Sequence, residues 1–153
     1  MPILGEYITV KEMVAIEMNA EALGVSTQLM MENAGRAIAN EIEARFPVGS
    51  KIVSVSGLTG NGGDAFTAAR HLVCKGYEVE SWILGDPRNI TLKNSQVNYN
   101  AVKHMTQSIK INVIKDSTLI EPIKADVVID GLIGTSLRGP LRAPVLQMVQ
   151  AIN

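Results

Sequence analysis

The sequence lacks the features of a secreted, zinc-stabilised or membrane-spanning protein. Its 153 residues include one cysteine and two histidines, so an internal disulfide is excluded and no zinc site is predicted. No long uncharged apolar run occurs, and the N-terminus has no basic stretch followed by an apolar one, so we predict neither a spanning helix nor a secretion signal. Fourteen basic residues balance fifteen acidic ones, which gives no electrostatic footprint for nucleic acid. We expect a cytoplasmic protein with no nucleic-acid or membrane partner.

The composition is that of one globular domain. Hydrophobic residues make up 46% of the chain, enough for a substantial core at this length. We see no repeat or linker, so residues 1–153 are treated as a single domain. Within it, residues 1–49 form a helical pair and residues 50–153 form β/α units. The lone thiol, Cys74, is expected to lie inert in the core.

Two amphipathic helices are predicted before residue 50. Thr9-Val-Lys-Glu12 fits a capping box, so the first helix should begin there, run to Leu23 and stop at Gly24. The second should begin after Ser26 or Thr27 and end near Phe46. Because both are amphipathic, both should pack on something larger. The predicted inner faces are Met13, Ile16, Ala20 and Leu23 in the first helix, and Met30, Ala34, Ala37, Ile38 and Ile42 in the second.

From residue 51 onward, short apolar strands alternate with helical patterns. We predict strands at 51–56, 77–84, 110–114 and 125–130, and helices at 64–75, 92–107, 117–123 and from Pro144 onward. Such alternation favours parallel pairing through right-handed crossovers. The fold class is therefore α/β: a three-layer, Rossmann-like, mainly parallel sheet with helices on both faces.

A glycine-rich loop, Gly57–Asp64, follows the first strand and precedes a helix. Backbone N–H groups at a helix N-terminus have no partner within the helix and favour an anionic ligand. Glycines there would let a phosphate approach the main chain. A plain tight turn is the alternative, since Asn-Gly is a strong turn dipeptide. Asp64 could equally be a simple N-cap.

A second glycine loop, Gly131–Pro140, follows the strand at 125–130. Since ligands bind beyond the carboxyl ends of parallel strands, both loops should open on the same edge of the sheet. Asp130 ends an apolar strand, where a buried carboxylate needs a partner, so it is either an acid/base, a cation ligand or a cap for the following N–H groups. Arg138 could grip a phosphate or lie solvated on the surface. His71 and His104 have no visible catalytic partner.

Three motifs together resemble the YjeF N-terminal domain, whose best-described members are NAD(P)H-hydrate epimerases. They are Leu29-Met-Met-Glu-Asn-Ala-Gly-Arg36, then Gly57-Leu-Thr-Gly-Asn-Gly-Gly-Asp64 with Ala-Ala-Arg-His-Leu72, then Asp130-Gly-Leu-Ile-Gly-Thr135. The resemblance covers nearly the whole chain. It implies repair of reduced nicotinamide cofactors hydrated at C6, by interconversion of the R and S hydrates of NADH and NADPH.

The resemblance also implies roles for individual residues. Asp130 would be the acid/base, and one potassium ion per subunit would be held by Asn61 and Asp130. The hydrate would contact Gly60, Asn61, Gly62, Gly63 and Asp64 in the first loop, and Gly134, Thr135, Ser136, Leu137, Arg138, Gly139 and Pro140 in the second.

The chain departs from the family pattern in three places. The family loop usually reads Asn-Asn-Gly-Gly-Asp-Gly, so Gly60 replaces an asparagine and Ala65 a glycine, and Ser136 stands where a glycine is common. The family also continues with another strand and a Val-Asp-Ile-Pro-Ser-Gly-Leu type segment, which we expect this chain to lack. A missing edge strand would favour a homo-oligomer or a partner that completes the sheet.

Two other functions compete with the epimerase. A non-catalytic nucleotide-binding or scaffold domain on the same fold is the main alternative, because a fold does not guarantee an activity. A dinucleotide oxidoreductase is disfavoured, since the first loop does not fit G-x-G-x-x-G and the strand at 77–84 ends without an acidic residue suited to a ribose.

Overall fold

The protein is built on a four-stranded parallel sheet. The computed structural model describes residues 7–135 and 137–153. The strands are β1 (Lys51–Ser56), β2 (Glu78–Leu84), β3 (Ile109–Ile114) and β4 (Val127–Gly131), and their order across the sheet is β3-β2-β1-β4. Every pairing is parallel, with β1 central against both β2 and β4. The predicted parallel sheet is confirmed.

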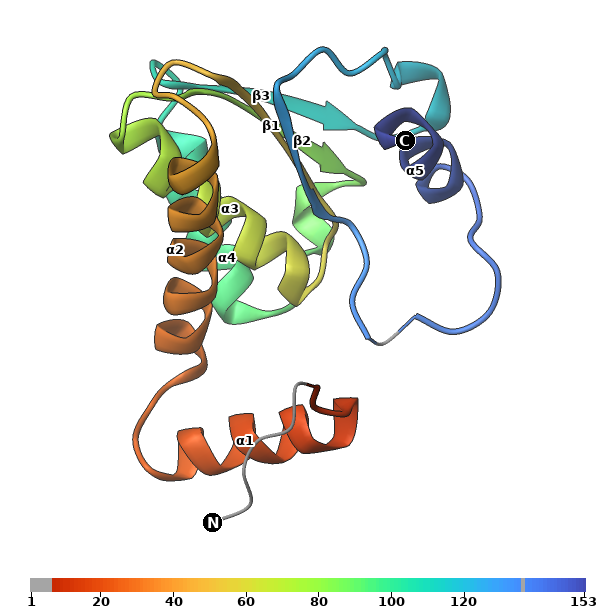
Figure 1. Ribbon diagram of the computed structural model, residues 1–153. Helices are drawn as coiled ribbons and strands as arrows, with labels where there is room; N and C mark the ends of the chain where they lie inside the picture. The colour runs from red at the N-terminus through yellow and green to blue at the C-terminus, as the bar shows by residue number, and fades with distance from the viewer. Residues whose placement is uncertain (1–6, 136) are drawn as a thin grey trace.

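Helices cover both faces of this sheet. They are α1 (Val10–Ala22), α2 (Thr27–Arg45), α3 (Gly60–Cys74), α4 (Lys93–His104) and α5 (Val145–Ile152), with 3-10 turns at Pro87–Asn89 and Ser117–Leu119. Figure 1 shows α2, α3 and α4 on one side and α5 on the other. The predicted helix at 117–123 is therefore only a single turn. No helix among the described residues is long and apolar enough to cross a bilayer.

Each strand supplies both layers of core because successive side chains point to opposite faces. In β1, Ile52 joins the cluster under α2, α3 and α4, which is centred on Phe66 and Leu72. The next residue, Val53, joins the cluster under α5, which contains the buried Met148. The continuous apolar strands are thus those of a sheet covered on both faces.

The buried face of α2 differs from the predicted one. The buried residues are Met31, Gly35, Ala39 and Ile42, whereas Ala34 and Ala37 are exposed and Met30 and Ile38 are half-buried. Gly35 explains the difference: a Cβ there would lie 2.3 Å from the Cβ of Thr67 in α3. The helix turns its glycine toward α3 for close approach, and a pattern that scores only apolar side chains cannot detect this.

Helix α1 has the predicted ends but not the predicted packing. Thr9 and Glu12 form the capping box, and Gly24 adopts a φ of 96°. None of the residues of α1 is buried, and Ile16 on its expected inner face is 46% exposed. The helix lies across the end of α2 (Figure 1), away from both core layers. The prediction that its apolar face packs inward is wrong.

Cys74 is exposed, not buried in the core. It is the last residue of α3, and the face of that helix that meets the sheet carries Ala65, Phe66, Ala69 and Leu72 instead. A cysteine one or two positions off this face emerges into solvent, so the prediction of a core thiol is corrected.

Candidate functional site

The two glycine loops meet where β1 and β4 end side by side. Ser56 and Gly131 are register partners in the sheet, and the N–H of Gly57 donates to the carbonyl of Gly131 over 2.9 Å. Beyond the strands, Nδ2 of Asn61 donates to the carbonyl of Ile133 over 2.8 Å. The prediction that both loops open on one edge of the sheet is confirmed.

Helix α3 begins earlier than predicted, inside the first glycine loop. Its first residue is Gly60 and its N-cap is Thr59, which makes no side-chain cap hydrogen bond. The N–H of Gly63 donates to the carbonyl of Thr59 over 3.2 Å. The N–H groups of Gly60, Asn61 and Gly62 precede this bond and have no acceptor in the helix. Asp64 is therefore not an N-cap, and the helix presents an uncapped, positive end to the site.

Most of the loop glycines allow close packing of one segment of the backbone against another. A Cβ on Gly62 would lie 2.0 Å from the carbonyl oxygen of Gly57, and one on Gly131 would lie 2.6 Å from the Cβ of Ala65. At Gly60, by contrast, the nearest atom outside the local helix is Cδ1 of Leu92 at 3.8 Å. The expectation that the glycines make room for a ligand thus fits Gly60, while Gly62 meets its own chain.

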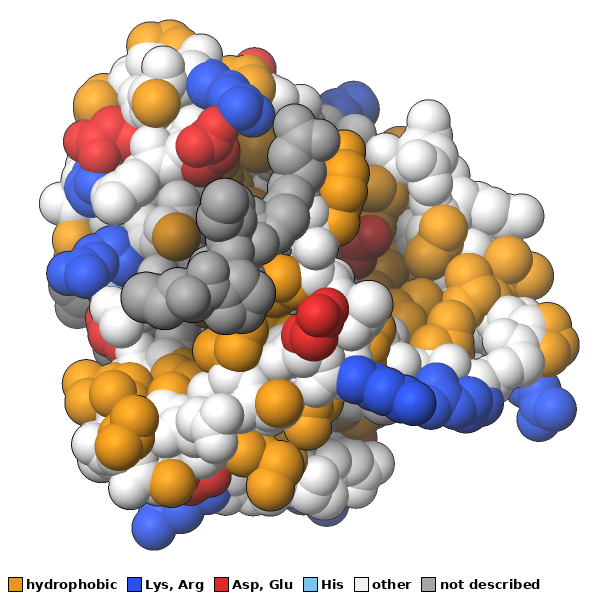
Figure 2. Space-filling view, turned by 60° about the horizontal axis from the view of Figure 1, so that its bottom comes forward, with side chains coloured by type: hydrophobic (Ala, Val, Ile, Leu, Met, Phe, Trp, Pro, Cys, Tyr) orange, Lys and Arg blue, Asp and Glu red, His pale blue; other side chains and the backbone are white. Residues whose placement is uncertain are grey.

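A cavity of about 580 Å³ lies on the second-loop side of the α3 N-terminus. It extends from Thr59 to the start of α5 along an arm formed by residues 132–135 and 137–143, and Arg138 and Arg142 contribute to its lining. Figure 2 shows a hollow between the body of the domain and the projecting arm, with hydrophobic side chains on its wall and basic ones near its rim. In this structure, Nη1 of Arg138 donates to the carbonyls of Thr135 and Leu137 over 3.3 and 3.1 Å.

A smaller cavity of about 380 Å³ lies on the opposite side of the same helix end. Its lining comes from α1, α2, α3 and α4 and includes Gly60, Asn61 and Asp64. Most of the predicted substrate residues that the structure describes are thus divided between two cavities, while Gly62, Gly63 and Thr135 line neither. Asn61 links the two cavities, because it lines the smaller cavity while its side-chain amide is bonded to Ile133 in the wall of the larger one.

Asp64 is the titratable group whose pKa is most raised at this site. Its burial and, secondarily, the negative charge of Glu17 on α1 raise its pKa to about 6. Both effects disfavour the carboxylate relative to the neutral acid. Asp64 can therefore exchange a proton near neutral pH.

Asp130 is exposed, which corrects the expectation of a buried carboxylate. It is the penultimate residue of β4, and its Oδ1 accepts the N–H of Leu132 over 3.0 Å. This is the cap that was one of the alternatives read from the sequence. Oδ2 makes no hydrogen bond with any residue that the structure describes, so it can face a ligand.

The remaining second-loop residues lie along the arm. Gly134 packs beside Asn61, since a Cβ on it would lie 2.9 Å from Oδ1 of that asparagine. Gly139 has a φ of 76°, a conformation that favours glycine. Thr135, Leu137, Arg138 and Pro140 are exposed. The prediction for Ser136 lies outside the described residues.

Comparison with known proteins identifies the fold. The family described as the YjeF-related protein N-terminus matches residues 27–153. The chain belongs to this family. The sequence resemblance is confirmed. The α/β fold agrees with that of a solved structure, yeast ynu0, with a TM-score of 0.74 at 22% identity, over 95% of this chain and 64% of that one.

The curated relatives of this YjeF-N chain include long bifunctional proteins and shorter ones. It is 38% identical to the bifunctional NAD(P)H-hydrate repair enzyme Nnr of Hyperthermus butylicus, over 98% of this chain and 28% of that protein. It is 34% identical to the NAD(P)H-hydrate epimerase of Cenarchaeum symbiosum, over 95% of this chain and 67% of that protein. The chain therefore spans less than a third of the bifunctional relative and two thirds of the shorter one.

Two YjeF-N motifs meet in a polar cluster that the sequence analysis missed. Nε2 of His71 lies 2.7 Å from Oε1 of Glu32, and Nη2 of Arg70 lies 2.5 Å from Oε2. The same Arg70 nitrogen donates to Oδ1 of the buried Asn98 over 3.1 Å. Although burial opposes it, hydrogen bonding from His71 and the charge of Arg70 lower the pKa of Glu32. The expectation that His71 has no acidic partner is thus wrong.

This cluster fixes α2 on α3 beneath the site. Met31, next to Glu32, packs at Gly63, where a Cβ would lie 2.5 Å from its Cε. The available signal was one acidic residue in the motif at 29–36 and two basic ones in the motif at 68–72, each within a helix. Only the helix packing shows that they face one another.

Proposed function

We propose that the chain is an NAD(P)H-hydrate epimerase domain, an isomerase that interconverts the R and S hydrates of NADH and NADPH. The observation that carries the proposal is the uncapped start of α3 beside the second glycine loop, with Asp130 at the same edge of the sheet. The names of relatives at 34–38% identity support the same reaction. The cofactor hydrate would be a small-molecule substrate, and we infer a cytoplasmic location for its repair.

The pyrophosphate of the substrate would lie at the N-terminus of α3. The N–H groups of Gly60 and Asn61 point out of the helix there, and the helix dipole favours negative charge. Arg138 and Arg142 line the adjoining cavity and would supply positive charge to phosphate oxygens. Thr135 and Leu137 to Pro140 would complete the contact along the arm, as would Gly134 at its base.

Asp130 would carry the proton transfers. As the acid, it would protonate the departing C6 hydroxyl, so that the C–O bond breaks, water leaves and the ring nitrogen lone pair forms an iminium. As the carboxylate, it would then take a proton from a water that adds to C6. Addition to either face of the planar iminium exchanges the R and S forms. The proton gained in the second step restores the acid, so the cycle is balanced.

We further propose one potassium ion per subunit, with Asn61 and Asp130 as ligands. The donor set fits, because an amide and a carboxylate oxygen are hard ligands suited to such a cation. The bond from Nδ2 of Asn61 to Ile133 leaves Oδ1 available, and Ile133 is only three residues beyond Asp130. When bound, the ion would fix the carboxylate and favour its charged form.

The decisive experiment is epimerisation of purified R-NADHX, followed by chiral separation, with and without potassium. Turnover that Asp130→Asn abolishes would support the proposed acid/base. Asp126→Asn is the matched control, because Asp126 lies at the other end of the same strand and also accepts one main-chain N–H, that of Lys51 at 2.7 Å. Full turnover by a folded Asp130→Asn protein would refute the assigned role.

A non-catalytic nucleotide-binding or scaffold domain is the second candidate. The observation that favours it is the structural use of Asp130 as a cap for Leu132. In that case a well-folded protein would bind the reduced dinucleotide hydrate, measured by calorimetry, without changing its R to S ratio.

A further inference from the structure

Helix α1 forms one wall of the smaller cavity, of about 380 Å³, beside the start of α3. The residues that it contributes are Val14, Glu17, Met18 and Glu21. They stand at positions i, i+3, i+4 and i+7, so they share a single face of the helix. The family match begins at residue 27 and does not include α1. The sequence resemblance therefore implies no role for this face.

The smaller cavity combines apolar walls with a few polar groups. Its apolar side chains include Val14 and Met18 of α1 and Met30 and Met31 of α2, and its amide and carboxyl groups include those of Asn61, Asp64 and Asn94. Sites for small molecules have this mixed lining and volumes of about 300–1,000 Å³. No residue of α1 is buried, so the helix does not itself fill the space that it encloses. The cavity is therefore suited to part of a small ligand.

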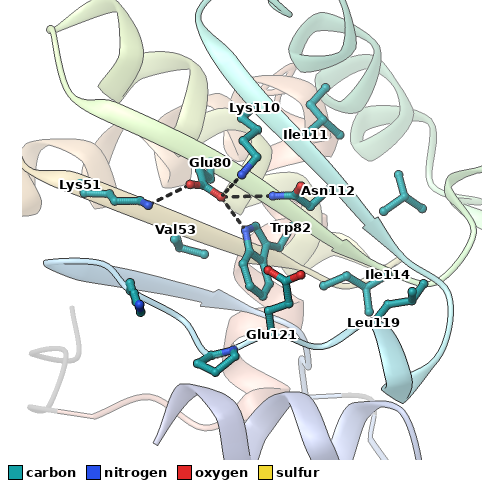
Figure 3. A pocket seen from close by; sticks show the side chains of 13 residues that line it. Lys51, Val53, Glu80, Trp82, Lys110, Ile111, Asn112, Ile114, Leu119 and Glu121 are labelled. Atoms are coloured by element: carbon teal, nitrogen blue, oxygen red, sulfur yellow. Dashed lines mark hydrogen bonds and ion pairs between the residues drawn. The ribbon is translucent and has the colours of Figure 1, made fainter.

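Asp64 lacks the internal partners that a covered carboxylate usually has. Glu80 gives the contrast, since it is 9% exposed and four donors converge on it in the groove of Figure 3. These donors belong to Lys51, Trp82, Lys110 and Asn112. Asp64 makes no hydrogen bond or ion pair with any residue that the structure describes, and the like charge of Glu17 acts on it. A half-buried carboxylate without a donor is unfavourable, so a ligand that supplies an N–H donor would relieve the cost.

The two cavities at the start of α3 have opposite charge. Among the described residues, Arg138 and Arg142 line the larger cavity without any acidic side chain. Glu17, Glu21 and Asp64 line the smaller one without any basic side chain. The phosphates of a dinucleotide are therefore attracted to the larger cavity and repelled from the smaller one. The smaller cavity fits a part of the substrate that is neutral or becomes positive.

The hydrated nicotinamide ring has both properties. Its carboxamide is neutral and would offer an N–H group to the carboxylate of Asp64. The carboxamide oxygen would accept from Nδ2 of Asn94, whose own Oδ1 already accepts the N–H of Ser95 over 3.0 Å. When the C6 hydroxyl leaves, the ring becomes a cationic iminium, which the charge of Glu17 would stabilise. The adenine ring develops no such charge during the reaction.

We propose that the smaller cavity holds the hydrated nicotinamide ring, with Val14 and Met18 of α1 against the ring and Glu17 facing it beside Asp64. Asn61 lines the same cavity and is the proposed partner of Asp130 at the potassium ion, so the ring would lie next to the assigned acid/base. The inference rests on the epimerase proposal for its substrate. It adds to that site a wall from outside the matched region.

The first test compares the binding of two ligands by calorimetry. An equilibrium mixture of the R and S hydrates of NADH carries the ring, whereas ADP-ribose carries the adenosine and both phosphates without it. Val14→Trp should fill the cavity, weaken binding of the hydrates about tenfold and leave ADP-ribose unchanged. Ile16→Trp is the matched control, because Ile16 and Val14 are each 46% exposed and only Val14 lines the cavity. Met18→Trp is a second variant with the same expected result.

The second test is the rate of epimerisation by Glu17→Gln. We expect kcat to fall about fivefold with little change in KM, because the lost charge acts on a cation that forms only during the reaction. Glu17→Asp keeps the charge and should retain most of the rate. An unchanged kcat in Glu17→Gln would refute the role of this residue.

The binding comparison does not need turnover, so it separates the two proposals. A wild type that binds the hydrates without interconverting them would refute the epimerase and not the ring subsite. Val14→Trp and Met18→Trp proteins that bind both ligands as wild type does, or that lose both equally, would overturn the subsite. Loss of ADP-ribose affinity alone would also overturn it, since the adenine would then lie against α1. A wild type that binds neither ligand would overturn both proposals.

Discussion

Replacing Gly62 by alanine should disrupt the start of α3 more than a glycine-to-alanine change at any other position of its first turn. The added Cβ would lie 2.0 Å from the carbonyl oxygen of Gly57 and 2.9 Å from its carbon. These are backbone atoms at the end of β1, where Gly57 is also bonded to Gly131. Since real Cβ contacts are rarely under 3.0 Å, helix and strand must separate by about 1 Å.

The expected loss is about 2 kcal/mol in the free energy of unfolding. Overpacking a rigid site costs about 1–3 kcal/mol, and a clash with backbone belongs at the upper end. Alanine recovers up to about 1 kcal/mol by its higher helix propensity. For a chain of this length such a loss lowers the melting temperature by about 6 °C.

Gly60→Ala is the matched control, because Gly60 lies two residues earlier in the same helical turn. Its Cβ would meet nothing closer than Cδ1 of Leu92 at 3.8 Å, so the same mutation should be neutral or stabilising by up to about 1 kcal/mol. Urea unfolding of both variants with equal m-values would give the comparison. Equal stability of the two variants would refute the packing argument for Gly62.

Three further variants probe charge and contact. The folded state keeps a proton on Asp64 up to its pKa of about 6, while the unfolded chain releases it near pH 4. Wild type should therefore lose stability as pH rises through this window. Asp64→Asn should remove this pH dependence of stability and gain about 1 kcal/mol at neutral pH, after allowance for partial exposure. Burial alone would raise the pKa of Glu80, but hydrogen bonds from Lys51 and Trp82 hold it at about 2. Its stabilisation should be present above about pH 4.5 and fade as pH falls toward 2. Stability should therefore fall less steeply over this range in Glu80→Gln than in wild type, and an equal fall in both proteins would contradict the assignment. Asn61→Ala removes the bond to Ile133 and should cost about 1 kcal/mol, measured by thermal melting; if turnover in the variant still responds to potassium, Asn61 is not a ligand.

The alternation of strands and helices was enough to predict the sheet, its parallel pairing and the meeting of the two loops. The start of α3 was missed, because glycine has low helix propensity and Gly60 to Gly63 read as loop. Tertiary packing overrides that preference where Gly62 must touch Gly57. The exposure of Asp130 was missed for a different reason. Its apolar neighbours in β4 predict burial, but the placement of α5 decides which residues of the strand are covered, and the sequence pattern does not give that placement.

The contacts among Gly57, Gly62 and Gly131 also bear on the thermodynamics of ligand binding. They hold the N–H groups at the start of α3 in place before any ligand arrives, so binding there requires little loss of backbone entropy. In the described part of the arm, Leu137, Arg138 and Pro140 are exposed and a Cβ on Gly139 would meet no atom within 4 Å, so ordering these residues around a ligand would cost more conformational entropy. Differences in affinity among relatives with the same glycine turn should therefore arise in the arm, and stiffening the arm should tighten binding without a new contact.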